Sequence, residues 1–246
     1  MCLIIAAYKV VEEFPIIIAS NRDEFLDRKS IPPRLYNGKP GIICGRDERC
    51  GGTWMGINAH GVFVGLTNRS GPRGEVSCHT KKSRGFICLE ALQQPSAEKI
   101  KSLVESQDID RYNSFNLLYM DRAHAFVTYY DDEITTHPLE PSIHVLTNGN
   151  INDKELYRIK RTFELIVGSE GMNVTMLLER FQTTLKDHKR GKELKDALCL
   201  HLGNYGTVSS SIIAMSGDPS QSIYLYAEGT PCHNTYNNIS HLFSRL

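Results

Sequence analysis

The sequence predicts an α+β fold in which two antiparallel sheets are covered by two pairs of helices, a four-layer αββα sandwich. Apolar, strand-like runs arrive in pairs around short polar turns, which is typical of antiparallel hairpins. Two clusters of amphipathic helical segments separate these pairs, and each apolar helix face needs a sheet to cover it. No linker-like stretch or internal repeat divides the 246 residues, so we expect a single domain over residues 1–246.

Four hairpins are expected because β-branched and aromatic runs flank residues that favour turns. The paired runs are 3–11 with 16–20, 53–58 with 62–68, 115–120 with 125–130, and 208–215 with 222–227. Their turns include Glu12-Glu13, Gly61 and Gly217-Asp218-Pro219. Two further strands are expected at 41–44 and 144–147.

Four helical segments follow from apolar residues at helical spacing. The first covers 81–94, and the second follows Ser96, which is expected to cap it. In the second half of the chain, Asn152 and Asn173 are expected to cap the other two. Their apolar faces comprise Leu156, Ile159, Phe163, Ile166 and Val167 in one segment, and Leu177, Leu178, Phe181 and Leu185 in the other.

The composition excludes several classes of partner. Because 28 Lys and Arg residues balance 28 Asp and Glu residues, we expect no binding to nucleic acid. No apolar run approaches the roughly 20 residues of a membrane-spanning helix, so no integral membrane segment is expected. The N-terminus does not read as a secretory signal, and the seven cysteines show no zinc-ligand spacing. We therefore expect free thiols, no metal, no resident cofactor and a cytoplasmic location.

Cys2 is the first candidate for chemistry. Initiator methionine is usually removed before a small residue, which would leave Cys2 with both a thiol and a free α-amine. The amine has a pKa of about 7.7–8.0 and the thiol of about 8.5, so both exchange protons at cellular pH. This is the arrangement of an N-terminal nucleophile. The alternative reading is a cysteine that only packs at the start of a strand.

The opening hairpin predicts which side chains accompany Cys2. If Glu12-Glu13 forms a two-residue turn, Cys2 pairs with Asp23, and a one-residue slip would pair it with Glu24. Paired residues share one side of a sheet with Cβ atoms roughly 4.5–5.5 Å apart. Asn21 and Asp23 are then expected on the face of Cys2. There a carboxylate can hold the α-amine and an amide can donate to a developing oxyanion.

Two other asparagines follow apolar strands. With a turn near residue 60, Asn68 is expected across from Gly51 or Gly52. Two glycines beside an asparagine permit a ligand to approach the protein backbone closely, or they form a tight bend. Asn148 likewise ends a strand-like run. Either asparagine is a candidate oxyanion donor, and the alternative is that each caps a turn.

A set of motifs occurs in a fixed order over most of the chain. They are Met1-Cys2, the NRDE tetrad at 21–24, Gly51-Gly52-Thr53-Trp54, Leu66-Thr67-Asn68, Ser83-Arg84-Gly85, Asn113-Ser114-Phe115-Asn116-Leu117 and Tyr205-Gly206-Thr207. This ordered set resembles the NRDE family, also called the transport and Golgi organisation family. That family is similar to the N-terminal nucleophile hydrolases, which implies the same αββα sandwich that the hairpin pattern predicts.

The resemblance also implies residue roles, through the choloylglycine hydrolase group of that superfamily. Cys2 is similar to the nucleophile that attacks an amide, Asp23 to the carboxylate that contacts its α-amine, and Asn148 to an oxyanion-hole asparagine. The sequence departs from the related patterns at two positions, since Ser20 and Val208 stand where arginine is found.

The leading hypothesis is therefore an N-terminal-cysteine amidohydrolase acting on small-molecule, non-peptide C–N amides. The candidate catalytic residues are Cys2, Asp23, Asn21 and Asn148, and the candidate substrate-binding residues are Arg22, Glu24, Trp54 and Asn68. The resemblance implies an alternative, a non-catalytic carrier that uses the same cleft for haem, acyl-CoA or another lipid. For that role the nine histidines offer axial ligands, and Lys81, Lys82 and Arg84 offer phosphate contacts. A membrane-traffic adaptor with an exposed apolar patch is a third reading.

Overall fold

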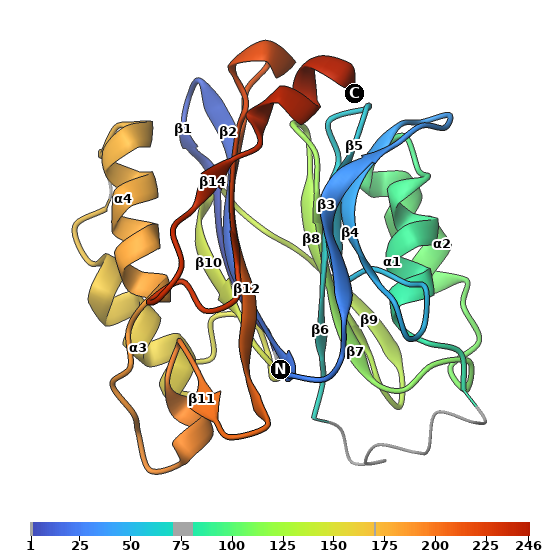
Figure 1. Ribbon diagram of the computed structural model, residues 1–246. Helices are drawn as coiled ribbons and strands as arrows, with labels where there is room; N and C mark the ends of the chain where they lie inside the picture. Colours follow the sequence, from blue (N-terminus) through green and yellow to red (C-terminus); the bar gives the residue numbers. More distant parts are fainter. Residues whose placement is uncertain (1, 71–80, 170) are drawn as a thin grey trace. The chain divides into compact units, whose positions relative to one another are not determined.

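The computed structural model describes residues 2–70, 81–169 and 171–246 (Figure 1). The chain forms two compact units. The first comprises Met1–Asp27 with Pro141–Ser244, and the second comprises Arg28–Glu140 with Arg245–Leu246. Among the described residues, each unit is built on one antiparallel sheet and carries two α-helices, so the predicted α+β class with two antiparallel sheets is confirmed.

The sheet of the first unit has the strand order β10-β1-β2-β12-β13-β14, and β11 pairs with β12. Its strands are β1 (Cys2–Val11), β2 (Phe14–Phe25), β10 (Ser142–Leu146), β11 (His201–Leu202), β12 (Tyr205–Met215), β13 (Ile223–Glu228) and β14 (Asn237–Asn238). Its helices are α3 (Tyr157–Ile166) and α4 (Val174–Leu185), with short 3-10 turns at Leu194–Asp196, Pro219–Gln221 and Ser240–Arg245.

Helices α3 and α4 lie against one face of this sheet, as Figure 1 shows. The core between them is apolar and fully buried, and includes Leu3, Ile5, Ile17, Ile212, Phe181 and Leu185. Residues that alternate with these, such as Ile4 and Ile18, are buried as well. Because both faces of β1 and β2 are covered, these strands read in the sequence as continuous apolar runs rather than as an alternating pattern.

The second unit is a meander in which consecutive strands pair in order from β3 to β9. Its strands are β3 (Ser30–Tyr36), β4 (Ile42–Asp47), β5 (Met55–Asn58), β6 (Phe63–Asn68), β7 (Phe115–Met120), β8 (Ala125–Tyr130) and β9 (Ile134–Pro138). Helices α1 (Gly85–Leu92) and α2 (Ala97–Glu105) pack on one face of this sheet over a core that includes Val64, Leu92, Ile100 and Phe115.

The first hairpin has the predicted turn but not the predicted register. Val11 pairs with Phe14, so Glu12-Glu13 is the two-residue turn. A β-bulge between Tyr8 and Val11 then shifts the pairing by one residue, and Lys9 within it has φ +53°. As a result Cys2 pairs with Arg22. The expectation that Cys2 faces Asp23, or Glu24 after a slip, was wrong because a bulge adds one residue to a strand.

The helix caps test the sequence reading directly. Ser96 and Asn173 are confirmed, since each side chain accepts a hydrogen bond from a backbone N–H of the first turn. Asn152 is not a cap: it has φ +61°, and its side chain accepts from the N–H of Val145 at 2.9 Å. Helix α3 begins later, at Tyr157.

Other boundaries differ in smaller ways. Helix α1 begins at Gly85 rather than at 81, and Val167 is 73% exposed instead of facing the core. The sequence reading did not find β3 or β9. In β3, Pro32-Pro33 removes two backbone donors, and the strand is irregular there. Within the described ranges, no helix is long and apolar enough to cross a membrane.

Candidate functional site

Cys2 stands at the first position of β1 and is half-buried. On one side it pairs with Arg22 of β2. On the other side β1 pairs with β10, with Ile4 opposite Leu146. If this register is continued by two residues in each direction, Asn148 falls beside Cys2. Arg22 is thus the observed partner of Cys2, and β10 ends at Leu146, two residues before Asn148.

The surroundings of the Cys2 thiol favour its protonated form. Burial raises the pKa of the thiol above its usual value, and the carboxylate of Asp23 raises it further, whereas the guanidinium of Arg22 lowers it. A backbone interaction with Asp23 also lowers this pKa, by less than the other effects. Because the net direction is upward, the thiol stays protonated near neutral pH and needs a base before it can attack.

The carboxylate of Asp23 is held on both oxygens. Arg158 of α3 donates from Nη2 to Oδ2 at 2.8 Å, and Thr207 of β12 donates from Oγ1 to Oδ1 at 2.7 Å. The hydroxyl of Tyr205 donates to the backbone carbonyl of Asp23 at 3.0 Å. The end of β2 is thus fixed to both α3 and β12, and the charge of Asp23 has a defined position.

Asn21 does not lie on the face of Cys2. It pairs with Leu3, whose side chain is in the core under α3 and α4. The side-chain amide of Asn21 donates to the carbonyls of Leu185 and Leu198, at 2.9 Å each. Because these two bonds commit both N–H groups, the expectation that Asn21 faces Cys2 was wrong, and the cause is again the one-residue bulge.

Arg22 and Glu24 alternate with Asn21 and Asp23 along β2. Arg22 is almost fully buried, and its charge lowers the pKa of both the Cys2 thiol and the Tyr226 hydroxyl, against the upward effect of burial. Glu24 is half-buried near the end of β2, where its carboxylate accepts from the N–H of Phe25 at 3.0 Å. Of the two, Arg22 is the charge that acts on Cys2.

Trp54 and Asn68 belong to the second unit. The N–H of Leu66 donates to the carbonyl of Trp54 at 2.8 Å, and Asn68 ends β6 opposite Phe115. The second hairpin has Met55 opposite Gly65 at the start of β5, so the pairing of Asn68 with Gly51 or Gly52 stays a prediction. Both side chains are half-buried.

Gly52 allows a close contact between two backbone segments of the second unit. A Cβ on Gly52 would lie 2.7 Å from the backbone of Gly85, and the N–H of Thr53 donates to the carbonyl of Gly85 at 3.1 Å. The close backbone approach that the sequence suggested for a ligand is thus made by the first residue of α1. This contact explains why glycine stands at both 52 and 85.

Arg158 was missed by the sequence reading, whereas Tyr205 and Thr207 appeared only as part of a motif. Arg158, Ile159 and Thr162 are the buried face of α3 in its first half. An arginine at a position where the helical spacing calls for an apolar residue could have predicted a buried ion pair, because a buried guanidinium needs an acidic partner. The partner, Asp23, lies 135 residues away in the sequence.

Four further side chains of the first unit, His188, Cys199, His201 and Cys232, each offer one ligand atom within 4.8 Å of the others. The sequence reading predicted no metal because these residues have no recognisable spacing.

Comparison with solved structures shows which fold the chain has. The chain is similar to the mutant C2A conjugated bile acid hydrolase from Clostridium perfringens, with 10% identity, coverage of 98% of this chain and 93% of that chain, and a TM-score of 0.61. It is also similar to penicillin V acylase from Agrobacterium tumefaciens, with 12% identity, coverage of 93% and 83%, and a TM-score of 0.53. The protein therefore has the fold of the N-terminal nucleophile hydrolases.

The sequence relatives give the family. A transport and Golgi organization 2 homolog of Mus musculus is 26% identical over 235 residues, and a homolog of Homo sapiens is 25% identical over 241 residues. Each comparison covers 83% of both chains. Residues 1–225 match the family described as Transport and Golgi organisation 2, and the chain belongs to that family.

Proposed function

We propose that this protein is an N-terminal-cysteine amidohydrolase that acts on small, non-peptide C–N amides. The observation that carries the proposal is the setting of Cys2, which pairs with Arg22 at one end of the sheet and whose thiol interacts electrostatically with Arg22 and Asp23. Two proteins of the same fold are named a hydrolase and an acylase, and the first of these structures is of a mutant C2A.

Removal of Met1, which lies outside the described residues, would activate the site. It would expose the α-amine of Cys2, which is close enough to take the thiol proton. Because the raised pKa keeps the thiol protonated, this internal base is what the chemistry requires. Asp23, fixed by Arg158 and Thr207, would then hold the resulting ammonium group.

The reaction has two stages. The sulfur of Cys2 attacks the amide carbon, a C–S bond forms, and the carbonyl oxygen becomes an oxyanion to which the side-chain amide of Asn148 donates. Collapse breaks the C–N bond, and the ammonium proton passes to the departing amine. Water then hydrolyses the thioester and restores the thiol. Arg22, on the face of Cys2, would bind a carboxylate of the substrate.

The carrier alternative has weaker support. The basic residues suggested for binding an acyl-CoA make hydrogen bonds within the second unit, where Lys82 contacts Glu90 at 2.6 Å. Arg84 donates to the carbonyl of Ser114 at 3.0 Å, and Lys81 to that of Tyr112 at 3.3 Å. The relatives' names refer to transport and Golgi organisation and specify no ligand. We also propose a cytoplasmic location, since the six described cysteines are free thiols.

Intact mass and amide hydrolysis test the proposal together. We expect purified protein without Met1 to release amines from a library of N-acyl amides. Cys2→Ala should abolish the release, and Cys2→Ser should reduce it strongly. Cys50→Ser, at a half-buried thiol in the second unit, is the matched control and should retain the activity. Quantitative retention of Met1, or inactivity of protein that lacks it, would contradict the proposal. Saturable binding of haemin or an acyl-CoA without hydrolysis would support the carrier.

A further inference from the structure

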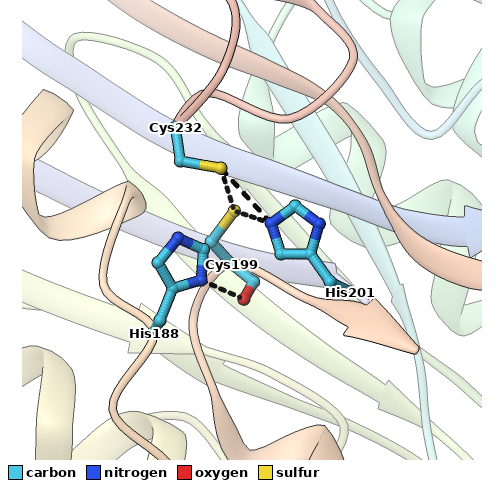
Figure 2. A group of neighbouring side chains, drawn as sticks. All are labelled: His188, Cys199, His201 and Cys232. Atoms are coloured by element: carbon cyan, nitrogen blue, oxygen red, sulfur yellow. Dashed lines mark hydrogen bonds between the residues drawn. The ribbon is translucent and has the colours of Figure 1, made fainter. Parts of the chain in front are cut away.

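Two histidines and two cysteines converge at one place in the first unit (Figure 2). They come from three separate parts of the chain. His188 follows α4, Cys199 and His201 belong to the segment that enters β11, and Cys232 lies in the turn after β13. Figure 2 shows the two sulfur atoms and the His201 ring pointing toward one another, with the His188 ring beside them.

The distances among three of the four ligand atoms match the edges of a tetrahedral metal site. The Cys199 and Cys232 sulfurs are 3.7 Å apart, and the Nε2 atom of His201 lies 3.8 Å from the first and 3.3 Å from the second. With Zn–S bonds of about 2.3 Å and Zn–N bonds of about 2.0–2.1 Å, a tetrahedron separates two sulfurs by roughly 3.8 Å and a sulfur from a nitrogen by roughly 3.5 Å.

The His188 ring is already oriented as a metal ligand. Its Nδ1 atom lies 3.2 Å from the backbone carbonyl oxygen of Cys199, to which it can only donate. This contact selects the tautomer that leaves the lone pair of Nε2 available. A ligating histidine usually donates its other ring N–H to a carbonyl or a carboxylate in the same manner.

The ligand segments are also held in place by hydrogen bonds that their backbone N–H groups donate. The N–H of Cys199 donates to the carbonyl of Asp187 at 3.0 Å, next to His188. The N–H of Leu200 donates to Oγ1 of Thr207 at 2.9 Å, between the two ligands of that segment. His188, Cys199 and His201 line a cavity of about 120 Å³ that also contacts Arg190, so an ion has a route to the ligands.

We propose that His188, Cys199, His201 and Cys232 bind one zinc ion. Two thiolates and two imidazoles in a tetrahedron form a complete structural site, with no position left open for a substrate. The site goes beyond the proposed hydrolase, because it does not include Cys2 and serves the fold.

A bound ion would stabilise the end of β2 that carries Asp23. The carbonyl of Leu198, next to Cys199, accepts hydrogen bonds from Asn21 at 2.9 Å and from Arg158 at 3.3 Å. Thr207 bonds both Leu200 and the carboxylate of Asp23. Metal binding at Cys199 and His201 would therefore fix residues 198–201. Arg158 is hydrogen-bonded to this segment directly, and Asp23 is connected to it through Thr207.

Metal analysis of the full-length protein tests the site. Protein purified under reducing conditions and supplied with Zn²⁺ should hold one zinc per chain by elemental analysis. After removal of zinc, Co²⁺ alone should produce the intense visible bands of a tetrahedral ion and thiolate-to-cobalt charge-transfer absorption. Cys232→Ser and His201→Asn should each lower both signals at least tenfold. Cys50→Ser and His233→Gln are the matched controls, since the His233 ring lies 5.3 Å from that of His201 but is outside the ligand set.

Two measurements keep the test decisive if a ligand variant fails to fold. The Co²⁺ spectrum of the wild-type chain needs no variant, and zinc should slow alkylation of Cys199 and Cys232 relative to Cys50. Cys2→Ala should retain the metal. The zinc proposal would therefore hold even if the hydrolase proposal failed. Wild-type protein that takes up neither Zn²⁺ nor Co²⁺, or that carries a Cys199–Cys232 disulfide under native reducing conditions, would overturn the proposal.

Discussion

The guanidinium of Arg158 in α3 and the carboxylate of Asp23 in β2 form a buried salt bridge, with an N–O distance of 2.8 Å. The side chains are 6% and 0% exposed. Thr207 occupies the second carboxylate oxygen, so the negative charge is paired and hydrogen-bonded on both sides. This one contact joins the helix layer of the first unit to the strand that lies beside Cys2.

Breaking this pair should destabilise the fold strongly. Asp23→Asn would leave Arg158 charged and buried without its partner, and Arg158→Met would do the same to Asp23. Each is expected to lower the free energy of unfolding by about 3–5 kcal/mol, measured by urea denaturation. The double variant should lose less than the sum of the two, because it leaves no unpaired charge. Lys195→Met, at the exposed pair with Glu193, should leave the midpoint unchanged. Additive losses would show that the two side chains act independently.

Lys9 has a left-handed backbone conformation within the bulge of β1, which is unfavourable for a side chain with a Cβ. Lys9→Gly should therefore raise the free energy of unfolding by about 1 kcal/mol, although glycine weakens a regular strand. Lys9→Val should lower it by about 1 kcal/mol, because a β-branched residue tolerates this conformation least. Thermal unfolding of the two variants against Lys9→Ala measures the difference. A Gly variant less stable than the Ala variant would contradict the assignment of strain to Lys9.

The bulge also marks the limit of prediction from the sequence. Apolar runs and turn residues located the hairpins, and strands 115–120 and 125–130 were predicted at their observed bounds, because a buried strand must carry such residues. The register of the site was not predictable in the same way. Lysine at position 9 carries no signal for a left-handed conformation, yet it decides whether Arg22 or Asp23 faces Cys2. A shift of one residue exchanges the two faces of a strand.

Long-range partners are the second limit. Cys2 was identified from its position alone, but the residues that organise its surroundings come from far along the chain. Arg158 meets Asp23, and His188 meets Cys232, only because α3, α4 and the turn after β13 pack against one sheet. Hydrophobic periodicity predicts that such helices are buried, but it does not specify which polar residues they bring together.

Gly52 and Gly85 should each be intolerant of a side chain. A Cβ on Gly52 would lie 2.7 Å from the Gly85 backbone, and a Cβ on Gly85 would lie 2.9 Å from that of Gly52. Since backbone must shift to relieve either contact, Gly52→Ala and Gly85→Ala are each expected to cost about 1–3 kcal/mol in urea denaturation. Gly41→Ala is the matched control in the same unit, because its Cβ would find ordinary contacts at 3.5 Å. Equal effects at Gly41 and Gly52 would exclude the close approach as the cause.

Stability should fall at alkaline pH through Cys44 of β4. Burial raises the pKa of its thiol from 9.0 to about 11, against the effect of a hydrogen bond with Thr53. Well below pH 9 the thiol is protonated in both the folded and the unfolded chain, so it adds no pH dependence there. Between pH 9 and 11 the unfolded chain loses this proton first, and the free energy of unfolding declines.

The decline due to Cys44 should reach at most about 2–3 kcal/mol over that interval, since each pKa unit corresponds to about 1.4 kcal/mol. Cys44→Ala tests this decline. The cavity that the substitution creates lowers the free energy of unfolding at every pH, whereas the loss of the thiol changes how steeply that free energy falls with pH. Urea denaturation in reducing buffer from pH 7 to 11 should therefore give a shallower decline for Cys44→Ala than for wild type. Parallel curves would show that Cys44 ionises equally in the folded and unfolded chains and that its burial does not oppose the thiolate.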